Sequence, residues 1–550
     1  MKKNLTVWNL FSVVILAAFA LFIMYPIFLI LYRSVIHGDT GALTFQNFAH
    51  FFAKKFYWGT MVNSLKVTVV STILSAALGL PLAYLMRSVK IKGSSFLNIL
   101  IVISYLSPPF IGAYAWIQML GRQGVITQFL NDTFGLHYGG VYGFAGIVLV
   151  FTLQSFPLVY IYVSGALKNL DNSLNEAAES LGCSRMGRIW KIIVPLVMPT
   201  LLASSMLVFM RVFADFGTPM LIGEGYKTLP VLIYNQFMGE VSGDDGFAAA
   251  ICCIVIGLTI VMFFVQRFLA GRNTYAMTAL RPMAAESLGG LRNILAHLAV
   301  YMVVGLAILP QFVVVYTSFL ATNGGQVFTG GFALQSYDAT LFAKDNDVIW
   351  HTYFLGLCAI AAVLVLGVLI AYLSVRKRNT LNSILDVITM FPFIIPGSVL
   401  GIAFVFAFNK SPIILTGMAL IMIISFAVRR MPYTVRSSTA ILGNISPSIE
   451  EAAISLGASD MTTFRKITVP MMMPGVLSGA IMSWVTIISE LSSSIILYTN
   501  STQTLTVSIY TEVIRGNYGN ASAYATILTV TSILSLLLFY KVTGRRDVSV

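Results

Sequence analysis

Charged residues are scarce in this sequence. Asp, Glu, Lys and Arg make up 10% of its 550 residues, whereas soluble domains carry roughly 25%. Hydrophobic residues make up 57%, and the mean hydropathy is +0.85. So little charge cannot cover the surface of a water-soluble globule. The composition therefore excludes an ordinary soluble domain and indicates an integral membrane protein.

Residue patterns that carry chemistry are also missing. The four cysteines form no CxxC pair, and the five histidines are scattered without ligand spacing, so neither a disulfide framework nor a metal site is expected. The sequence contains no GxxxxGK[ST] phosphate loop and no HExxH motif. We therefore expect a chain that is not an enzyme, binds no cofactor of its own and hydrolyses no ATP.

Long apolar runs are what the sequence has in abundance. A helix needs about 20 apolar residues to cross a hydrocarbon core. Twelve runs of this kind predict an all-α fold with twelve transmembrane helices, near 8–36, 61–87, 96–120, 143–167, 196–222, 246–269, 293–320, 350–375, 384–408, 412–436, 471–497 and 521–541.

Basic residues recur at alternate ends of these runs. The net charge of +13 is therefore not gathered on one compact domain, which argues against a nucleic-acid partner and follows the positive-inside pattern instead. The pattern predicts a multi-pass protein with both chain termini in the cytoplasm. The residues concerned include Arg87, Lys90, Lys92, Lys168, Arg185, Arg188, Lys191, Arg267, Arg292, Arg376, Lys377, Arg378, Arg436, Arg465, Lys466 and Lys541.

A polar stretch occurs twice at a separation of 275 residues. "NEAAESLGCSRMGRIWKIIVPLVMP" (175–199) aligns without a gap with "EEAAISLGASDMTTFRKITVPMMMP" (450–474). Each half contains six runs. Because six is an even number, both halves enter the membrane from the same side, as parallel repeats. We predict a first repeat over 1–270, a cytoplasmic linker over 271–291 and a second repeat over 292–550, with the polar loops at about 171–195 and 446–470.

Each polar loop predicts two short helices joined at a glycine. Gly182 and Gly457 tolerate the left-handed backbone of such a corner. Pro195 and Pro470 follow, where a proline can open the next helix. The result is a compact knob whose Ala and Leu face can enter a groove of another protein.

These residues resemble the cytoplasmic loop of the permease subunits of binding-protein-dependent ABC importers. The match is carried by Glu176, Ala177, Ala178 and Gly182, and again by Glu451, Ala452, Ala453 and Gly457. The resemblance implies the type I importer permease fold in a bacterial inner membrane. It also implies that the two loops dock onto two ATP-binding cassette ATPase subunits, which bind ATP and Mg²⁺, and that an extracellular binding protein delivers the solute.

The fused arrangement of two repeats, with "FADFGTP" (213–219), is similar to ferric-iron importer permeases. Ferric iron is therefore the first expected solute. Related permeases for polyamines, thiamine, phosphonates and sugar phosphates share the pattern, and "ISELSSSIILY" (488–498) leaves these alternatives open. An ion-coupled secondary transporter also commonly has twelve spans, but needs no repeated cytoplasmic knob.

Two acidic residues occupy equivalent positions in the repeats. Asp215 and Glu490 each lie 20 residues beyond Pro195 and Pro470. A charge at the centre of a span costs about 2.5–3.5 kcal/mol, so it usually faces a cavity or a partner. One hypothesis is that both acids line the pathway and favour a cation. The alternative is that Arg211 neutralises Asp215 as an i,i+4 pair, and that nearby serines donate hydrogen bonds to Glu490.

Helix breaks and short helices are also expected along the pathway. Prolines inside the third and ninth runs predict kinks there, at Pro108, Pro109, Pro392 and Pro396, which either border the solute route or are simple packing kinks. The segments 229–237 and 505–513 are too short to span a membrane. We interpret them as outward-facing gate helices, with a membrane-surface turn as the alternative.

Overall fold

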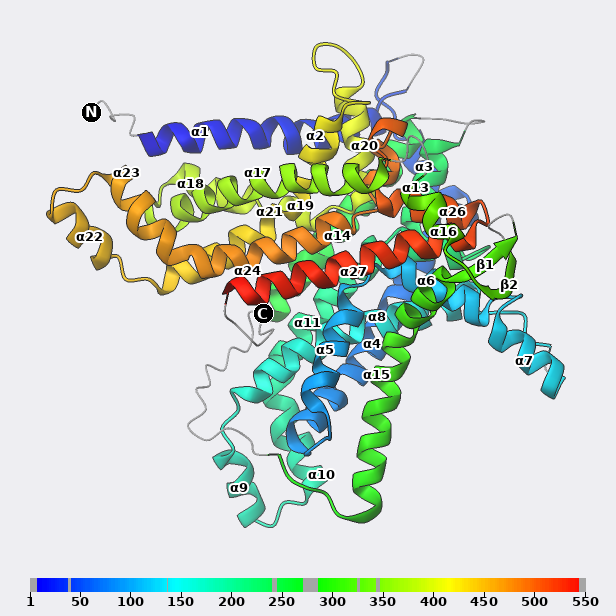
Figure 1. The fold of residues 1–550 in the computed structure, drawn as a ribbon. Coiled ribbons are helices and arrows are strands. Elements are labelled where there is room, and N and C mark those ends of the chain that lie inside the picture. The colour runs from blue at the N-terminus through cyan, green and yellow to red at the C-terminus, as the bar shows by residue number, and fades with distance from the viewer. Residues whose placement is uncertain are drawn as a thin grey trace.

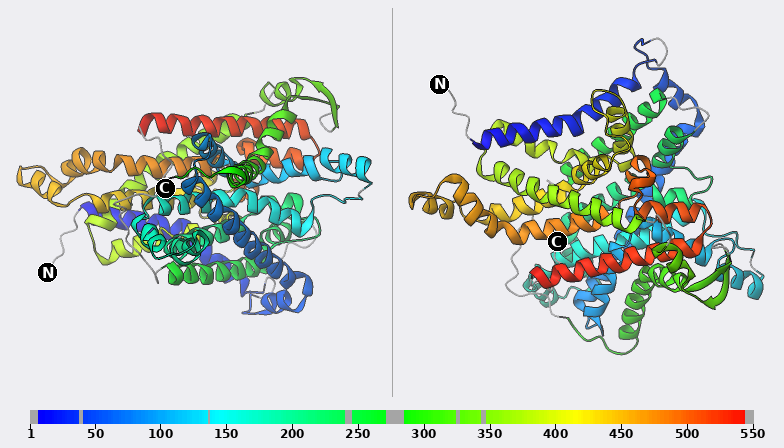
Figure 2. Two further views of the ribbon diagram at one scale, coloured as in Figure 1. Left: turned by 90° about the horizontal axis from the view of Figure 1, so that it is seen from below. Right: turned by 45° about the horizontal axis from the view of Figure 1, so that its top comes forward.

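The structure is a computed structural model that describes residues 7–37, 41–135, 137–239, 245–270, 285–323, 327–342 and 347–543. It is built almost entirely of helices. Figure 1 shows two helical arms that meet at one end and diverge toward the other, and the views of Figure 2 agree. The sequence-related polar loops lie at the far ends of the two arms, which we call the knob ends; the opposite end is the shared end.

The first repeat contains, in chain order, α1 (Val7–Phe19), η1 (Ala20–Met24), α2 (Tyr25–Ser34), α3 (Gln46–Ala53), α4 (Lys55–Ser88), α5 (Ser94–Leu106), α6 (Pro109–Leu120), α7 (Val125–Phe134), α8 (Gly143–Lys168), α9 (Ser173–Ser180), α10 (Arg185–Arg188), η2 (Ile189–Ile193), α11 (Val194–Ala214), α12 (Gly217–Ile222), α13 (Leu229–Met238) and α14 (Asp245–Ala270).

The second repeat contains α15 (Gly290–Ser318), β1 (Leu320–Asn323), β2 (Val327–Phe332), α16 (Gln335–Leu341), α17 (Val348–Arg376), α18 (Thr380–Ile388), α19 (Phe391–Ile394), α20 (Gly397–Phe408), α21 (Ala419–Asn444), α22 (Ser448–Ser455), α23 (Asp460–Thr463), η3 (Phe464–Thr468), α24 (Val469–Ile488), α25 (Ser494–Leu497), η4 (Asn500–Thr502), α26 (Leu505–Ile514) and α27 (Tyr518–Thr543). Strands β1 and β2 form an antiparallel hairpin that pairs Leu320 with Phe332.

Nine helices in the described part of the chain are long and apolar enough to cross a membrane, and two bent helix pairs raise this number to eleven. The bends measure 99° between α5 and α6 and 110° between α18–α19 and α20. Pro108 and Pro396 stand directly before α6 and α20, which confirms the predicted helix breaks. The remaining expected run, 412–436, falls on α21, whose arginines lower its hydropathy. The count of twelve stays a prediction.

The cores of the two repeats are built alike. Helices α4, α8 and α11 pack together in the first repeat, as α17, α21 and α24 do in the second. The same close approach recurs in both: a Cβ atom on Gly79 would lie 2.7 Å from Val159, and one on Gly367 would lie 2.9 Å from Thr434. Because both glycines allow two helix backbones to approach, this contact supports the pseudo-two-fold relation that the sequence repeat predicts.

The first helix of each repeat packs on the other repeat. Helices α1 and α2 lie against α17, α18 and α20, while α15 lies against α5 and α6. The Trp8 ring centroid is 4.8 Å from that of Tyr372, and the Ser12 hydroxyl donates to Asn382 Oδ1 at 2.6 Å. This exchange ties the arms together, and the order of runs in the sequence does not predict it.

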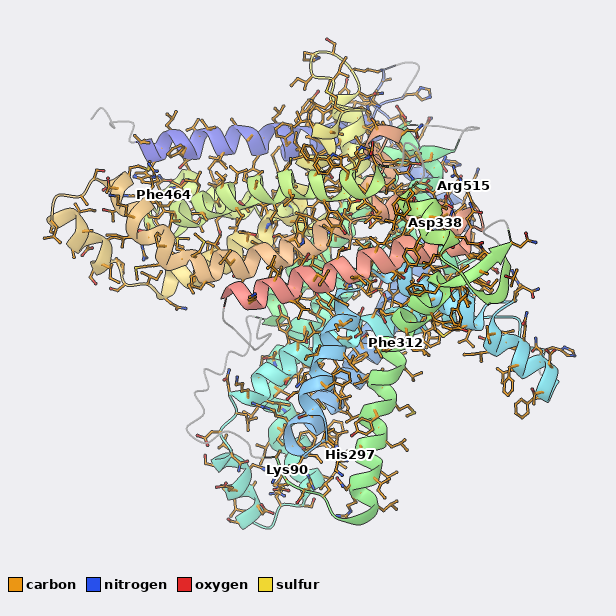
Figure 3. All side chains as sticks on the ribbon, viewed as in Figure 1. Lys90, His297, Phe312, Asp338, Phe464 and Arg515 are labelled. Carbon is orange, nitrogen blue, oxygen red and sulfur yellow. The ribbon has the colours of Figure 1, made fainter. Side chains whose placement is uncertain are left out.

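Most of the predicted linker, 271–284, lies outside the described residues. Its described end is hydrogen-bonded to the chain at the C-terminal end of α4. The Lys90 N–H donates to the Glu286 carbonyl oxygen, and the Glu286 N–H donates to the Ser88 carbonyl oxygen, each at 2.9 Å. Close by, the His297 Nε2 of α15 accepts from the Lys92 N–H at 3.1 Å. Figure 3 labels Lys90 and His297 on this arm.

Candidate functional site: two knobs and an inter-repeat charge cluster

The first knob, residues 171–195, has the predicted helix–corner–helix form. Helix α9 spans eight residues, and Gly182 follows it with φ +78°. The Ser184 hydroxyl oxygen then caps α10 by accepting from the Gly187 N–H. The chain continues through the π-helical turn η2 into α11, where Pro195 occupies the first turn. A residue with a side chain would be strained at Gly182.

The second knob, residues 446–470, repeats this geometry. Helix α22 also spans eight residues, and Gly457 adopts φ +91°. Ser459 caps α23 as Ser184 caps α10, and the π-helical turn η3 precedes α24 and its Pro470. Two copies of so specific a geometry confirm the predicted shape of the knobs.

Each knob offers an unpaired apolar tip. Leu181 and Leu456 stand at equivalent positions directly before the corner glycines, and they are 88% and 89% exposed. Glu176 and Glu451 are also exposed, whereas Ala453 is buried beneath its helix. An exposed leucine beside an exposed carboxylate is a surface suited to docking in a groove of another protein.

The two knobs are anchored differently, which the sequence repeat did not reveal. In the second knob, Arg376 Nε donates to Glu450 Oε1 at 2.9 Å, and the two side chains are only 10% and 11% exposed. Lys377 pairs with Asp460 at 3.0 Å. The Phe464 ring packs against Trp8 with centroids 5.3 Å apart. Helix α1 of the first repeat therefore braces the knob of the second.

The first knob has a more exposed ion pair, formed within the knob itself. Arg188 pairs with Glu179 of its own knob at 2.5 Å, and the Glu179 side chain is 65% exposed. The Asn172 amide donates to Glu176 Oε1 at 2.8 Å. Both contacts lie within the knob, so they stiffen it.

The repeats touch each other at the shared end. A Cβ atom on Gly217 would lie 3.0 Å from the Leu491 side chain, and the Phe216 ring centroid is 6.0 Å from that of Tyr510. The Tyr114 hydroxyl donates to the Tyr518 carbonyl oxygen at 2.6 Å. We call this set of contacts the closure, because it joins the two repeats at the shared end.

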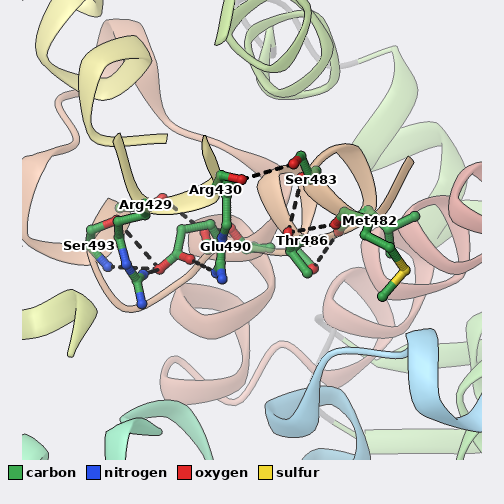
Figure 4. A network of polar contacts seen from close by, with 11 residues as sticks. Arg429, Arg430, Met482, Ser483, Thr486, Glu490 and Ser493 are labelled. Atoms are coloured by element: carbon green, nitrogen blue, oxygen red, sulfur yellow. Dashed lines mark hydrogen bonds and ion pairs between the residues drawn. The ribbon is translucent and has the colours of Figure 1, made fainter. Parts of the chain in front are cut away.

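Glu490 lies beside the closure with two arginines that sequence analysis missed. Its carboxylate forms ion pairs with Arg429 and Arg430, and Oε1 also accepts from the Ser493 N–H at 3.2 Å and the Ser493 hydroxyl at 3.4 Å (Figure 4). The predicted serine contact is thereby confirmed. Two adjacent arginines inside the apolar run 412–436 were the available signal.

Asp215 occupies the equivalent place in the first repeat. Helix α11 ends at Ala214, and Asp215 Oδ1 accepts from the Thr218 N–H at 2.9 Å, as Glu490 accepts from Ser493. Among the described residues Arg211 forms no ion pair with Asp215; its guanidinium carbon lies 4.7 Å from the centroid of the Tyr105 ring. The close i,i+4 pair is therefore not formed. A role of both acids in the pathway stays a prediction.

The anchors of the knobs lead to a testable difference. Replacing Arg376 with Ala leaves the buried Glu450 unpaired, a change that typically costs about 3–5 kcal/mol. Replacing Arg188 with Ala breaks a pair whose carboxylate is mostly exposed, which costs about 1 kcal/mol or less. Amide hydrogen exchange should therefore rise strongly in 446–457 of R376A and little in 173–182 of R188A. Equal rises in both variants would contradict this account of the anchors.

Comparisons with known proteins identify a protein family that matches this chain twice. The family model described as "Binding-protein-dependent transport system inner membrane component" matches residues 75–275 and again 363–546. The chain is 30% identical over 546 residues to the ferric transport system permease protein FbpB of Actinobacillus pleuropneumoniae, covering 97% of this chain and 78% of the relative. It is also 30% identical, over 505 residues, to the putative ferric transport system permease protein FbpB 1 of Haemophilus influenzae, covering 90% and 78%.

A shorter relative corresponds to a single repeat. The molybdenum transport system permease protein ModB of Escherichia coli is 28% identical over 218 residues, which cover 93% of ModB but 39% of this chain. A single-repeat relative and a double match are what a tandem fusion produces. The chain is a transport subunit with two repeats, and it belongs to the family of binding-protein-dependent transport system inner membrane components.

Proposed function

We propose that this chain is the permease of an ATP-driven importer of ferric iron. The proposal that the cargo is ferric iron rests on one observation, the 30% identity over nearly the whole chain to a ferric transport permease. An extracellular binding protein delivers the iron, and two ATP-binding cassette ATPase subunits bind ATP and Mg²⁺. The chain itself supplies the route.

The knobs are the docking points for the ATPases. Their exposed tips, Leu181 and Leu456, enter one groove on each ATPase, and the exposed Glu176 and Glu451 flank them. Basic residues border both loops, so the positive-inside rule places both knobs and both chain termini in the cytoplasm. The closure then lies on the outer side of the inner membrane.

The arrangement of the arms supports a rocking mechanism. In this structure the knob ends are apart (Figure 1), and the two repeats are in contact at the closure. When the ATPases close on ATP, they draw the knobs together. The arms are packed helices that transmit the motion as rigid bodies, so the contact between Gly217 and Leu491 separates and the pathway opens outward.

Similarity to two other relatives supports other cargoes as second candidates. A relative described as a putative 2-aminoethylphosphonate permease, from Salmonella choleraesuis, is 26% identical over 270 residues, and ModB is described as a molybdenum permease. Both cover about one repeat or less than half of this chain, so they are the second candidates for the cargo.

Uptake measurements test the cargo directly. A bacterial host without its own ferric uptake should accumulate radioactive ferric iron when it carries this chain with its ATPase and binding protein. Unlabelled ferric iron in excess should suppress the signal, whereas 2-aminoethylphosphonate should not. Uptake of a phosphonate with no accumulation of iron would overturn the ferric assignment and keep the importer.

A substitution at a knob corner tests the coupling. Gly182→Pro forces φ to about −65° where the chain needs a positive value, so the corner is lost. We expect uptake to fall at least about tenfold while ATP hydrolysis by the complex continues, which is uncoupling. Glu451→Lys should act in the same direction at the second knob.

The matched control is Gly443→Ala in α21. Nothing lies within 4 Å of a Cβ atom at that position, and the backbone there has ordinary helical geometry, so uptake should be unchanged. If Gly182→Pro transports iron as well as this control does, the knob is not the point of coupling.

A further inference from the structure

Five ionisable side chains gather where the two repeats meet beside the closure. Three of them are arginines and two are acids, so one positive charge is in excess. We call this set the charge cluster: Arg211, Asp215, Arg429, Arg430 and Glu490. Charges inside a membrane protein are costly, and they usually mark a pathway or a binding site.

The negative charge of the cluster is already committed to partners within the chain. Glu490 is 4% exposed, and its two oxygens are taken by Arg429 and Arg430 together with Ser493. Asp215 caps the start of α12 through Thr218. The Glu490 carboxylate is therefore not presented to a passing cation, whereas the Asp215 side chain is partly exposed.

The positive charge is more available. Arg429 and Arg430 are paired with Glu490, and their side chains are only 12% and 18% exposed, whereas Arg211 is partly exposed. Arg211 has no carboxylate within 4 Å among the described residues and rests on the Tyr105 ring. The Tyr105 side chain also accepts a hydrogen bond from Arg211, but a guanidinium has five N–H donors, so donors remain for another acceptor.

The cluster spans both repeats. Tyr105 of the first repeat interacts electrostatically with Arg211 and with Arg430 of the second. Asp215 lies near Glu490 of the second repeat, because Gly217, two residues after Asp215, packs against Leu491, the residue after Glu490. The excess charge is therefore shared between side chains of both repeats.

We propose that the charge cluster is a cargo-binding site for an anion, and that ferric iron crosses as a negatively charged complex with oxygen-donor ligands rather than as the bare cation. The guanidinium fork matches carboxylate and phosphate oxygens, whereas the excess positive charge repels an uncomplexed cation. This reverses the cation preference expected from two acids alone. The inference rests on the proposed ferric importer.

The sign of the charge effect tests the site. In the uptake system described above, Arg211→Gln removes the available positive charge and Arg211→Glu reverses it, while Arg211→Lys preserves it. If the cargo is an anion, initial ferric uptake with citrate as the supplied ligand should fall in the Arg211→Gln variant. It should fall at least about tenfold in the Arg211→Glu variant. The Lys variant should stay within about threefold of the wild type.

A second variant adds positive charge instead. Asp215→Asn preserves the cap of α12, because Asn is as good an N-cap as Asp, and it raises the excess charge. Initial uptake above the wild-type level is expected. If Arg211 variants fail to assemble, as judged by the amount of ATPase that co-purifies, Asp215→Asn alone decides the question.

The contrary outcomes are distinct. If Arg211→Glu transports as well as or better than the wild type, or if Asp215→Asn loses more than about half of the uptake, the path selects a cation or ignores charge, and the anion site is overturned. If the wild type itself accumulates no iron, the ferric function fails first, independently of the variants.

Discussion

The contact between the two repeats at the shared end is the interaction on which the rest of the structure depends. Gly217 has no room for a side chain, since a Cβ atom there would lie 2.8 Å from Phe110 and 3.0 Å from Leu491. That close backbone approach keeps the shared ends together while the arms diverge toward the knobs. A contact that is narrow and lies far from the knobs can be opened by a modest rotation of each arm.

The exchange of first helices gives the arms a second connection. Helices α1 and α2 contact the second repeat, with α2 also on α14, and α15 contacts the first repeat as well as α27, so separating the arms would break packing of these helices. Trp8 extends this connection to the second knob, where it packs against Phe464. The knob of the second repeat, which is a proposed ATPase contact, therefore packs against a helix of the first repeat.

Much of the architecture follows from local sequence. Apolar length predicted the spans, prolines 108 and 396 predicted the helix breaks, and the corner glycines predicted the knobs, because each of these features is decided within a few residues. The partner of a helix is decided elsewhere. The apolar face of α1 is satisfied equally by its own repeat or by the other one, so periodicity could not reveal the exchange.

The charged contacts that distinguish the repeats were beyond sequence reasoning for a related reason. Arg376 pairs with Glu450, 74 residues away, and Glu490 pairs with arginines about 60 residues away. The repeat alignment places Asn175 opposite Glu450 and Gln154 opposite Arg429. The two halves have therefore kept the same helices and changed the groups between them, which an alignment shows only as mismatches.

The distance between the knob tips tests the central claim most directly. Leu181 and Leu456 are exposed and equivalent, so spin labels on cysteines at these two positions, in a chain whose four native cysteines are replaced, report the separation of the arms. In the complete transporter, trapping the ATPases with bound ATP should shorten this distance and separate a second label pair placed across the closure. A knob distance that does not change between the nucleotide-free and ATP-bound states would contradict the account.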